Sequence, residues 1–314
     1  MPAGFLMMVI NNGCKYLQIN TDFIEGDLKL NQESSLIYLK FGSYMSMNSL
    51  NTEEISEKIL ASCYSLQKLS FVSCPLTIDA VKSICYQNGK TLQVLELTNI
   101  GSIASYYEGS NDEFTCLKLI LENCQCLKEV KFDKSIASEK NAYYLVKNIT
   151  ATIEVFSISS INDKQLKILV KRCKKIKTLK SASTDITGKS LKLIIKTLKT
   201  TLQHLEIDHT KIDDPVTILG LRAMPSLRIL TISPLSSIKD ELKKYLPLLN
   251  IREIVDHGDI CHDLTFYKQF SRDFSSKEGI WEIKAKELQL FRKHKPSSLA
   301  EETFLSWLTD FSNL

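Results

Sequence analysis

The pattern L-x-x-L-x-L recurs along most of this chain, with Ile, Val or Phe replacing Leu in some copies. Successive copies begin 23 to 35 residues apart, and most intervals are close to 26 residues. The clear copies begin at Leu36, Leu66, Leu92, Leu127, Ile153, Ile176, Leu202 and Leu227. Short units at such a period cannot bury an apolar face alone, so they must stack on one another. The chain is therefore constrained to a repeat architecture, and its function is expected on a surface.

Each repeat predicts one short strand followed by one helix. Because alternate strand residues point to opposite faces, positions one, four and six of each copy should face inward and positions three, five and seven outward. After one such strand, Leu166, Leu169, Val170 and Cys173 follow the i, i+3, i+4, i+7 spacing of a half-buried helix. The expected fold class is α/β: a leucine-rich-repeat solenoid with a curved parallel sheet on the concave side and helices on the convex side.

Two regions are expected from the extent of the repeats. Residues 1–255 should form the solenoid, with about nine to ten repeats and a degenerate first strand around Cys14, Leu17 and Ile19. Residues 256–314 lose the periodicity and are rich in aromatic residues, which predicts a helical cap over the open end of the core. Its last helix could alternatively present a partner-binding face.

Cysteines occupy fixed places in the repeats. Cys63, Cys124 and Cys173 each stand three residues before a copy begins, where a small apolar thiol suits a buried position. An odd total of nine cysteines at such positions favours reduced thiols over a disulfide framework. The apolar run from Gly4 to Ile10 is too short for a signal-peptide core, and no stretch approaches the length of a membrane span. We expect a protein of the cytoplasm, the nucleus or both, with no membrane partner.

The stretch 50–74 closely resembles the cysteine-containing leucine-rich repeats of F-box proteins, and the segments 184–191 and 210–214 resemble weaker versions of it. The resemblance covers roughly residues 14–250. It implies a substrate receptor of a cullin-type ubiquitin ligase, in which an N-terminal F-box docks the ligase and the repeats hold the protein substrate.

The resemblance lacks a recognisable F-box. Only about a dozen residues precede the first strand, and the stretch 53–60, although slightly similar to an F-box helix, is in register with the repeats. We expect either a fragment or alternative product of a longer F-box protein, with ligase subunits as partners, or a free-standing relative that recruits no ligase.

The outward positions provide the predicted partner-binding surface. Their charges are mixed in sign, and two tyrosines stand near the start, which suits a protein partner better than a phosphate backbone. The predicted contact residues of the concave face are Tyr16, Tyr38, Lys40, Lys68, Glu96, Glu129, Lys131, Lys180, His204, Glu206 and Asp208.

A basic block provides the alternative hypothesis. Residues 164–200 contain twelve Lys or Arg and one acidic residue, a net +11 that leaves −7 for the rest of the chain. Such a convex face attracts nucleic acid or an acidic partner, and its centre is Lys171, Arg172, Lys174 and Lys175. Because the block has no aromatic residue for base stacking, nucleic acid is a less favoured partner than a protein. In this alternative the chain is a scaffold that acts independently of any ligase.

Motifs that could carry chemistry have structural interpretations. Gly188-Lys189-Ser190 lacks the first glycine of a P-loop, because Ser183 stands there, and it coincides with a predicted helix start. Residues 256–263 hold six potential metal ligands but no companion pair, so a polar loop is the better interpretation. His204, Glu206 and Asp208 share an outward strand face without a nucleophile. We predict a non-enzymatic protein without metal or cofactor.

The interval between Leu92 and Leu127 contains about nine surplus residues, within 102–114. Tyr106 and Tyr107 stand among small polar residues there, as in an extended loop. This insertion is either a contact element or a variable segment without function.

Overall fold

The computed structural model describes residues 3–20, 34–42, 50–74, 76–100, 112–133, 136, 138–207, 220–232 and 250–252. The chain divides into two units, Met1–Ile254 and Val255–Leu314, and every described residue belongs to the first. The predicted cap, the 256–263 segment, Asp208 and the tyrosines of the insertion lie outside the described residues.

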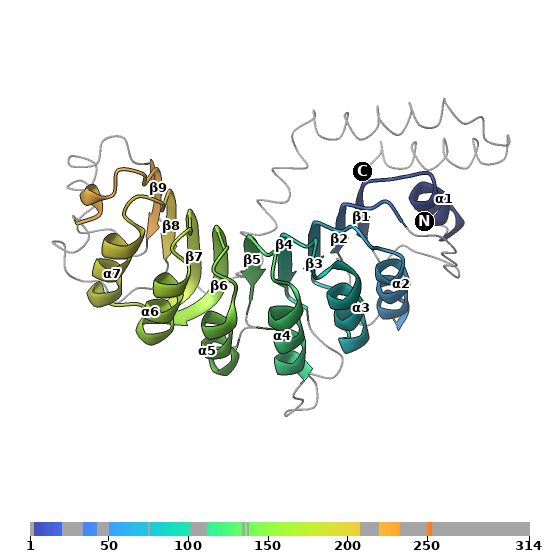
Figure 1. Cartoon of the computed structure of the whole chain (residues 1–314), viewed down its shortest axis with the longest axis horizontal. Coiled ribbons are helices and arrows are strands. Elements are labelled where there is room, and N and C mark those ends of the chain that lie inside the picture. The colour runs from blue at the N-terminus through green and yellow to red at the C-terminus, as the bar shows by residue number, and fades with distance from the viewer. Residues whose placement is uncertain are drawn as a thin grey trace, which may run out of the picture. The chain divides into compact units, whose positions relative to one another are not determined.

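The described strands form one parallel sheet in which each strand pairs with its neighbour in the sequence (Figure 1). This order is expected when every strand comes from one repeat and every crossover has the same hand. The strands are β1 (Tyr16–Asn20), β2 (Tyr38–Gly42), β3 (Lys68–Val72), β4 (Val94–Thr98), β5 (Glu129–Phe132), β6 (Val155–Asn162), β7 (Thr178–Asp185), β8 (His204–Ile207), β9 (Ile229–Ile232) and β10 (Asn250–Arg252).

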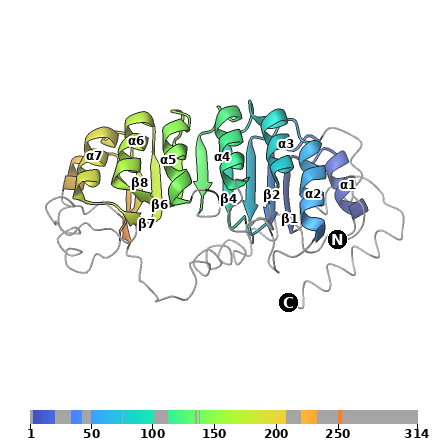
Figure 2. The same ribbon diagram turned by 90° about the horizontal axis from the view of Figure 1, so that it is seen from below.

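Helices alternate with the strands and stand side by side along one face of the sheet (Figure 2). In Figure 1 they follow the outer side of a curved path and the strands follow its inner side. The helices are α1 (Ala3–Asn11), α2 (Leu50–Ala61), α3 (Ile78–Asn88), α4 (Asp112–Asn123), α5 (Glu139–Asn148), α6 (Asp163–Arg172), α7 (Gly188–Leu198) and the 3₁₀ turn η3 (Gly220–Ala223). The predicted α/β class and parallel sheet are confirmed.

The core follows the repeat pattern. Position one of every clear copy is buried, and so is position four. Position six supplies three of the four largest fully buried side chains, Phe41, Phe71 and Phe132, and the ring centroids of Phe41 and Phe71 lie 4.7 Å apart. Burying a side chain of this size contributes about 1.5–3 kcal/mol. Cys63, Cys124 and Cys173 are buried free thiols, as predicted.

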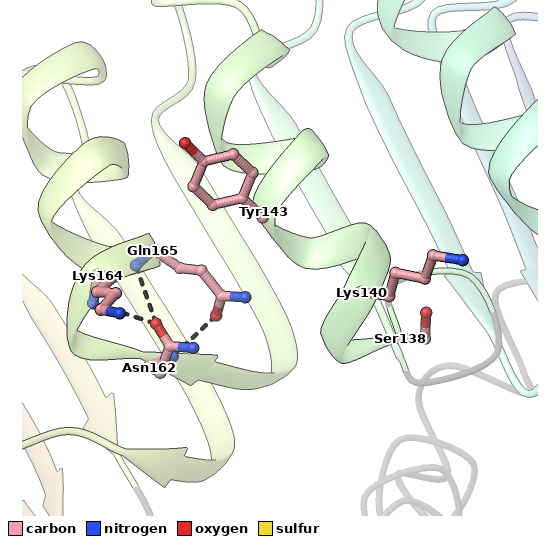
Figure 3. Close-up of a pocket in the computed structure, with 6 residues that line it drawn as sticks. All are labelled: Ser138, Lys140, Tyr143, Asn162, Lys164 and Gln165. Carbon is pink, nitrogen blue, oxygen red and sulfur yellow. Dashed lines mark hydrogen bonds between the residues drawn. The ribbon is translucent and has the colours of Figure 1, made fainter.

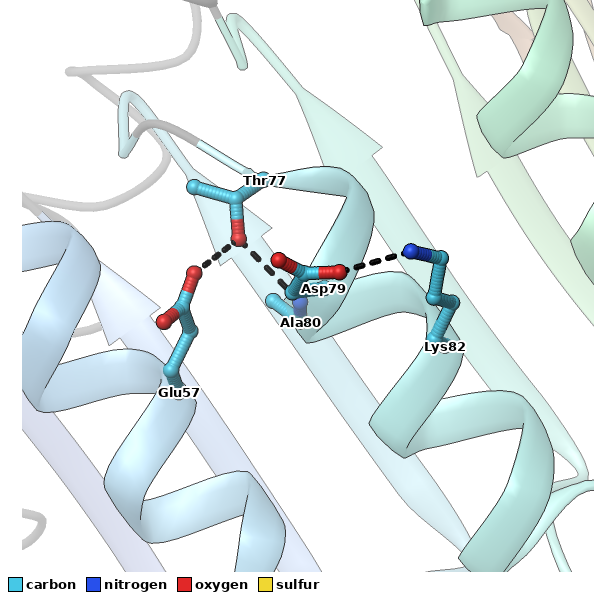
Figure 4. Close-up of polar contacts among 5 residues, drawn as sticks. All are labelled: Glu57, Thr77, Asp79, Ala80 and Lys82. Atoms are coloured by element: carbon cyan, nitrogen blue, oxygen red, sulfur yellow. Dashed lines mark hydrogen bonds and ion pairs between the residues drawn. The ribbon is translucent and has the colours of Figure 1, made fainter.

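Threonines that begin helices are held by carboxylates of the preceding helix. At α3, Thr77 accepts a hydrogen bond from the Ala80 amide at 3.1 Å and donates one to Glu57 of α2 (Figure 4). At α7, the hydroxyl and amide of Thr187 donate to the Asp163 carboxylate of α6 at 2.7 and 2.9 Å. These acidic residues therefore join neighbouring repeats.

The motif Gly188-Lys189-Ser190 forms the first turn of α7, as predicted. The helix begins at Gly188, and the Thr187 side chain caps it by accepting from the Lys189 amide at 3.3 Å. Ser190 is buried against the core. The triplet is thus a helix start in which only the lysine is exposed.

Some expectations need correction. The outward residues Ser70 and Thr231 are buried, and Ser70 Oγ donates a hydrogen bond to the Glu96 carboxylate of the next strand. At position six of its copy, Ser181 is a buried hydroxyl without a hydrogen-bond partner in the described structure. Helix α1 and strand β10 are additional elements, and α1 contributes Leu6 and Ile10 to the common core.

Candidate functional site

The strand register places the outward side chains in two continuous rows, which we call the strand face. The position-three row runs Tyr16, Tyr38, Lys68, Val94, Glu129, Val155, Thr178, His204, Ile229 and Asn250. The position-five row runs Gln18, Lys40, Ser70, Glu96, Lys131, Ser157, Lys180, Glu206, Thr231 and Arg252. Every described residue predicted for the concave face lies in one of these rows.

A first charged cluster surrounds Glu96 on β4. Its carboxylate accepts a hydrogen bond from Ser70 Oγ at 2.8 Å and forms an ion pair with Lys131 Nζ at 2.7 Å. Burial raises the pKa of Glu96, but the Lys131 ammonium, the Ser70 hydroxyl and the charge of Lys40 outweigh it and hold the pKa below its usual value. Glu96 is therefore a fixed negative charge between two lysines.

Tyrosines occupy the N-terminal end of the strand face. The Lys68 ammonium lies 5.0 Å from the centroid of the Tyr38 ring, in cation–π geometry. Burial, with the negative charge of Glu96, raises the pKa of the Tyr38 phenol, so the hydroxyl stays neutral. Tyr16 on the neighbouring strand is 69% exposed. This pair provides the aromatic contact area of the face.

A second charged cluster surrounds Glu206 on β8. Lys180 Nζ lies 3.0 Å from its carboxylate, and His204 Nε2 lies 3.4 Å from the same oxygen, a distance too long for a strong hydrogen bond. Burial raises the pKa of Glu206, yet His204 and Lys180 more than compensate and lower it to about 2. A carboxylate with this pKa is a poor proton acceptor at neutral pH, so the cluster is suited to binding rather than acid–base catalysis.

An uncharged band separates the two clusters. It consists of Val155 and Ser157 on β6 and Thr178 on β7. Lys131 and Lys180 border this band on either side, each oriented by its own carboxylate. The strand face therefore carries two ion-paired clusters on either side of a neutral band.

The predicted basic residues lie away from this face. Lys171 and Arg172 end α6, and Lys174 and Lys175 follow it in the turn, all of them exposed. The Arg172 side chain also donates to the Ile149 carbonyl of the preceding repeat. The structure thus separates the two predicted sets of binding residues.

A shallow pocket of about 640 Å³ lies between the starts of α5 and α6 (Figure 3). Its lining residues are Ser138, Lys140, Tyr143, Asn162, Lys164 and Gln165. Asn162 Oδ1 accepts from the amides of Lys164 and Gln165 at 3.1 and 3.0 Å, and Gln165 Oε1 accepts from the Asn162 amide at 2.9 Å. The two side-chain oxygens therefore form a capping box at the start of α6.

A row of charges at position two was not predicted. Lys177 Nζ pairs with Glu154 at 2.6 Å, and Lys128 Nζ donates to Gln93 Oε1 at 3.0 Å. Both contacts join neighbouring strands beside the strand face. The signal that could have predicted this row is a polar residue at position two, which seven of the eight clear copies have; the exception is Ile37.

The fold and this surface define the class of the protein: a repetitive α/β protein with a parallel sheet and a row of charges of both signs along its strands. Neither a protein-family model nor a curated protein matches the chain. Within the described ranges, no helix is long and apolar enough to cross a membrane. Among the same residues, no three His, Cys, Asp or Glu side chains gather as metal ligands.

We expect Glu206→Gln to reduce the free energy of unfolding at pH 7. A carboxylate with a depressed folded-state pKa stabilises the fold above its unfolded pKa, and this contribution is lost as the pH falls through the folded value. The difference in the free energy of unfolding between wild type and variant should therefore shrink as the pH falls from about 4.5 towards 2. Urea titrations over this range measure it.

Glu154→Gln is the matched control, because Glu154 also pairs with a lysine and is 34% exposed, close to the 31% of Glu206. The hydrogen bond from Lys177 lowers the pKa of Glu154, whereas burial is the largest influence on the pKa of Glu206. The effect of Glu154→Gln should be small at every pH. If both variants lost the same amount of unfolding free energy with the same pH dependence, the role assigned to the contacts of Glu206 with Lys180 and His204 would be contradicted.

Proposed function

We propose that the repeats are leucine-rich repeats and that the strand face binds a protein partner. The observation that carries this proposal is the arrangement of two in-register rows whose charges are already paired at Glu96–Lys131 and Glu206–Lys180. Side chains fixed before binding lose little entropy on association. Alternating fixed charges select a partner with the complementary pattern.

The resemblance to F-box repeats supports a more specific proposal. The module would act as the substrate-binding part of a ubiquitin-ligase receptor and would not itself catalyse a reaction. Buried free thiols at Cys63, Cys124 and Cys173 fit a reducing cellular compartment such as cytoplasm or nucleus.

Affinity capture from cells with mass spectrometry tests the strand face. Changing Tyr38, Lys131 and Glu206 together to alanine should reduce recovery of the partner about tenfold or more, since central aromatic and charged contacts dominate binding. Thermal unfolding of the purified variant checks that it remains folded.

The chain offers a control with the same three residue types on its helices: Tyr86 of α3 with Lys118 and Glu122 of α4, all exposed. Their triple replacement by alanine should leave recovery unchanged. If partners survive the strand-face change and disappear with the helix change, the strand face is not the binding surface. Cullin-complex subunits among the recovered proteins support the ligase proposal, and their absence favours a ligase-independent scaffold.

A further inference from the structure

The outward-facing residues of the helices are mixed in type on α3 and α5 but are all lysine or arginine on α6 and α7. Residues at i, i+3 and i+7 form the outer row of each of four helices. In α3 this row is Asp79, Lys82 and Tyr86, and in α5 it is Lys140, Tyr143 and Lys147. In α6 it is Lys164, Lys167 and Lys171, and in α7 it is Lys189, Lys192 and Lys196. The mixed rows of α3 and α5 show that the repeat does not require lysine at these positions.

Every exposed residue of α6 and α7 is a lysine or an arginine. Further exposed cations follow each helix, so the two helices and their turns carry ten. We call this set the lysine face: Lys164, Lys167, Lys171, Arg172, Lys174, Lys175, Lys189, Lys192, Lys196 and Lys199.

The lysine face has few acidic neighbours among the described residues: the charge of Lys189 helps to lower the pKa of Asp163, and that of Lys175 the pKa of Glu154. None of its members forms a salt bridge with an acidic side chain of the described residues. The nearby Asp163 carboxylate is bound by Thr187, and Glu154 pairs with Lys177 outside the set. Unpaired cations at this density create a positive potential that draws in polyanions.

We propose that the lysine face binds the phosphate backbone of a double-stranded nucleic acid without reading its sequence. Packed helices lie about 8–10 Å apart, and α6 measures about 12 Å along its axis from Lys164 to Arg172. A duplex carries one phosphate per about 1.7 Å of axis when both strands are counted, or about seven over this length. The ten cations of the lysine face are therefore enough to neutralise the phosphates of a duplex segment of this length.

Its composition argues against other polyanions. Lysine is depleted in specific protein interfaces, which instead use aromatic residues and arginine. Binding of single strands relies on aromatic stacking, and neither α6 nor α7 contains an aromatic residue. Neither helix exposes an apolar residue that would insert into a membrane surface. This surface is independent of the strand face, so either proposal can fail alone.

Fluorescence anisotropy of the full chain with a labelled DNA duplex tests the proposal, with an RNA duplex of the same sequence in a second arm. With six or more phosphates contacted, affinity should fall at least about 10³-fold between 50 and 200 mM salt. Changing Lys167, Lys171, Lys192 and Lys196 together to glutamine should reduce the salt slope by about three to four.

The matched control removes the same charge elsewhere, by changing Lys15, Lys82, Lys90 and Lys118 to glutamine. These lysines are exposed and lie outside the lysine face. Duplex binding whose salt slope changes only in the lysine-face variant supports the proposal. The proposal is overturned by equal losses in both variants, by no duplex binding at 50 mM salt, or by tighter binding to a single strand, a polyglutamate peptide or phosphatidylserine vesicles.

Discussion

Replacing Asn88 with alanine should lower the free energy of unfolding by about 2–5 kcal/mol, because it leaves two buried backbone groups unpaired. Asn88 ends α3 with its side chain fully buried. Its Nδ2 donates to the Cys63 carbonyl at 2.8 Å, and its Oδ1 accepts from the Leu66 amide at 2.9 Å. These bonds hold the turn that leads from α2 into β3. Urea titration followed by circular dichroism measures the loss.

Asparagine also ends α4 and α5, which provides internal controls. The side chain of Asn123 donates to the Leu119 carbonyl, and that of Asn148 to the Tyr144 carbonyl, each within its own helix. Asn123→Ala should change stability by less than about 0.5 kcal/mol, since Asn123 is exposed. Similar losses for Asn88 and Asn123 would contradict the bridging role assigned to Asn88.

Replacing Phe71 with alanine should cost about 3–5 kcal/mol, because it removes a fully buried ring and leaves a cavity. Phe71 stacks on Phe41 of the adjacent strand, so the cavity opens between two repeats. Stability of a repeat array depends on contacts between neighbours. Hydrogen exchange should therefore show protection lost first in β2, β3 and β4.

Tyr86→Ala is the comparison for Phe71→Ala, because Tyr86 is 92% exposed on α3. It should leave both the urea midpoint and the exchange pattern unchanged. A Phe71→Ala protein that retains wild-type protection throughout β2–β4 would rule out a core continuous between these repeats.

The strands were predictable because one face of each is buried. A shift of one residue would expose the whole apolar set, so aligning the copies also gave the register. That is why Tyr38, Lys131 and Glu206 could be assigned to the strand face before their contacts were known. The helices α6 and α7 were predictable from the spacing of their apolar residues, because each helix also buries one face.

The contacts among these residues were not predictable. Whether Glu96 pairs with Lys131 or Lys40 depends on side-chain positions that the repeat pattern does not specify. Asn88, Asn123 and Asn148 are the same residue at the same helix end, yet only Asn88 is fully buried between repeats. Helix α1 and β10 were missed because neither belongs to a complete copy of the pattern.

One recurring signal could have been found in the sequence. A hydroxyl residue precedes several copies, and Ser35, Thr91 and Thr152 each donate to the carbonyl of the first residue of the preceding copy, at 3.3, 2.8 and 2.8 Å. Such bonds satisfy a carbonyl at the strand entry and link successive repeats. Serine or threonine at this position is therefore part of the repeat.

Site-specific photo-crosslinking in cells tests most directly whether the strand face holds the partner. A benzoylphenylalanine at Val155 would lie in the uncharged band between the two charged clusters, and one at Tyr86 would lie on the helices. The proposed function predicts a discrete protein adduct from Val155 and none from Tyr86. An adduct from Tyr86 with none from Val155 would contradict it.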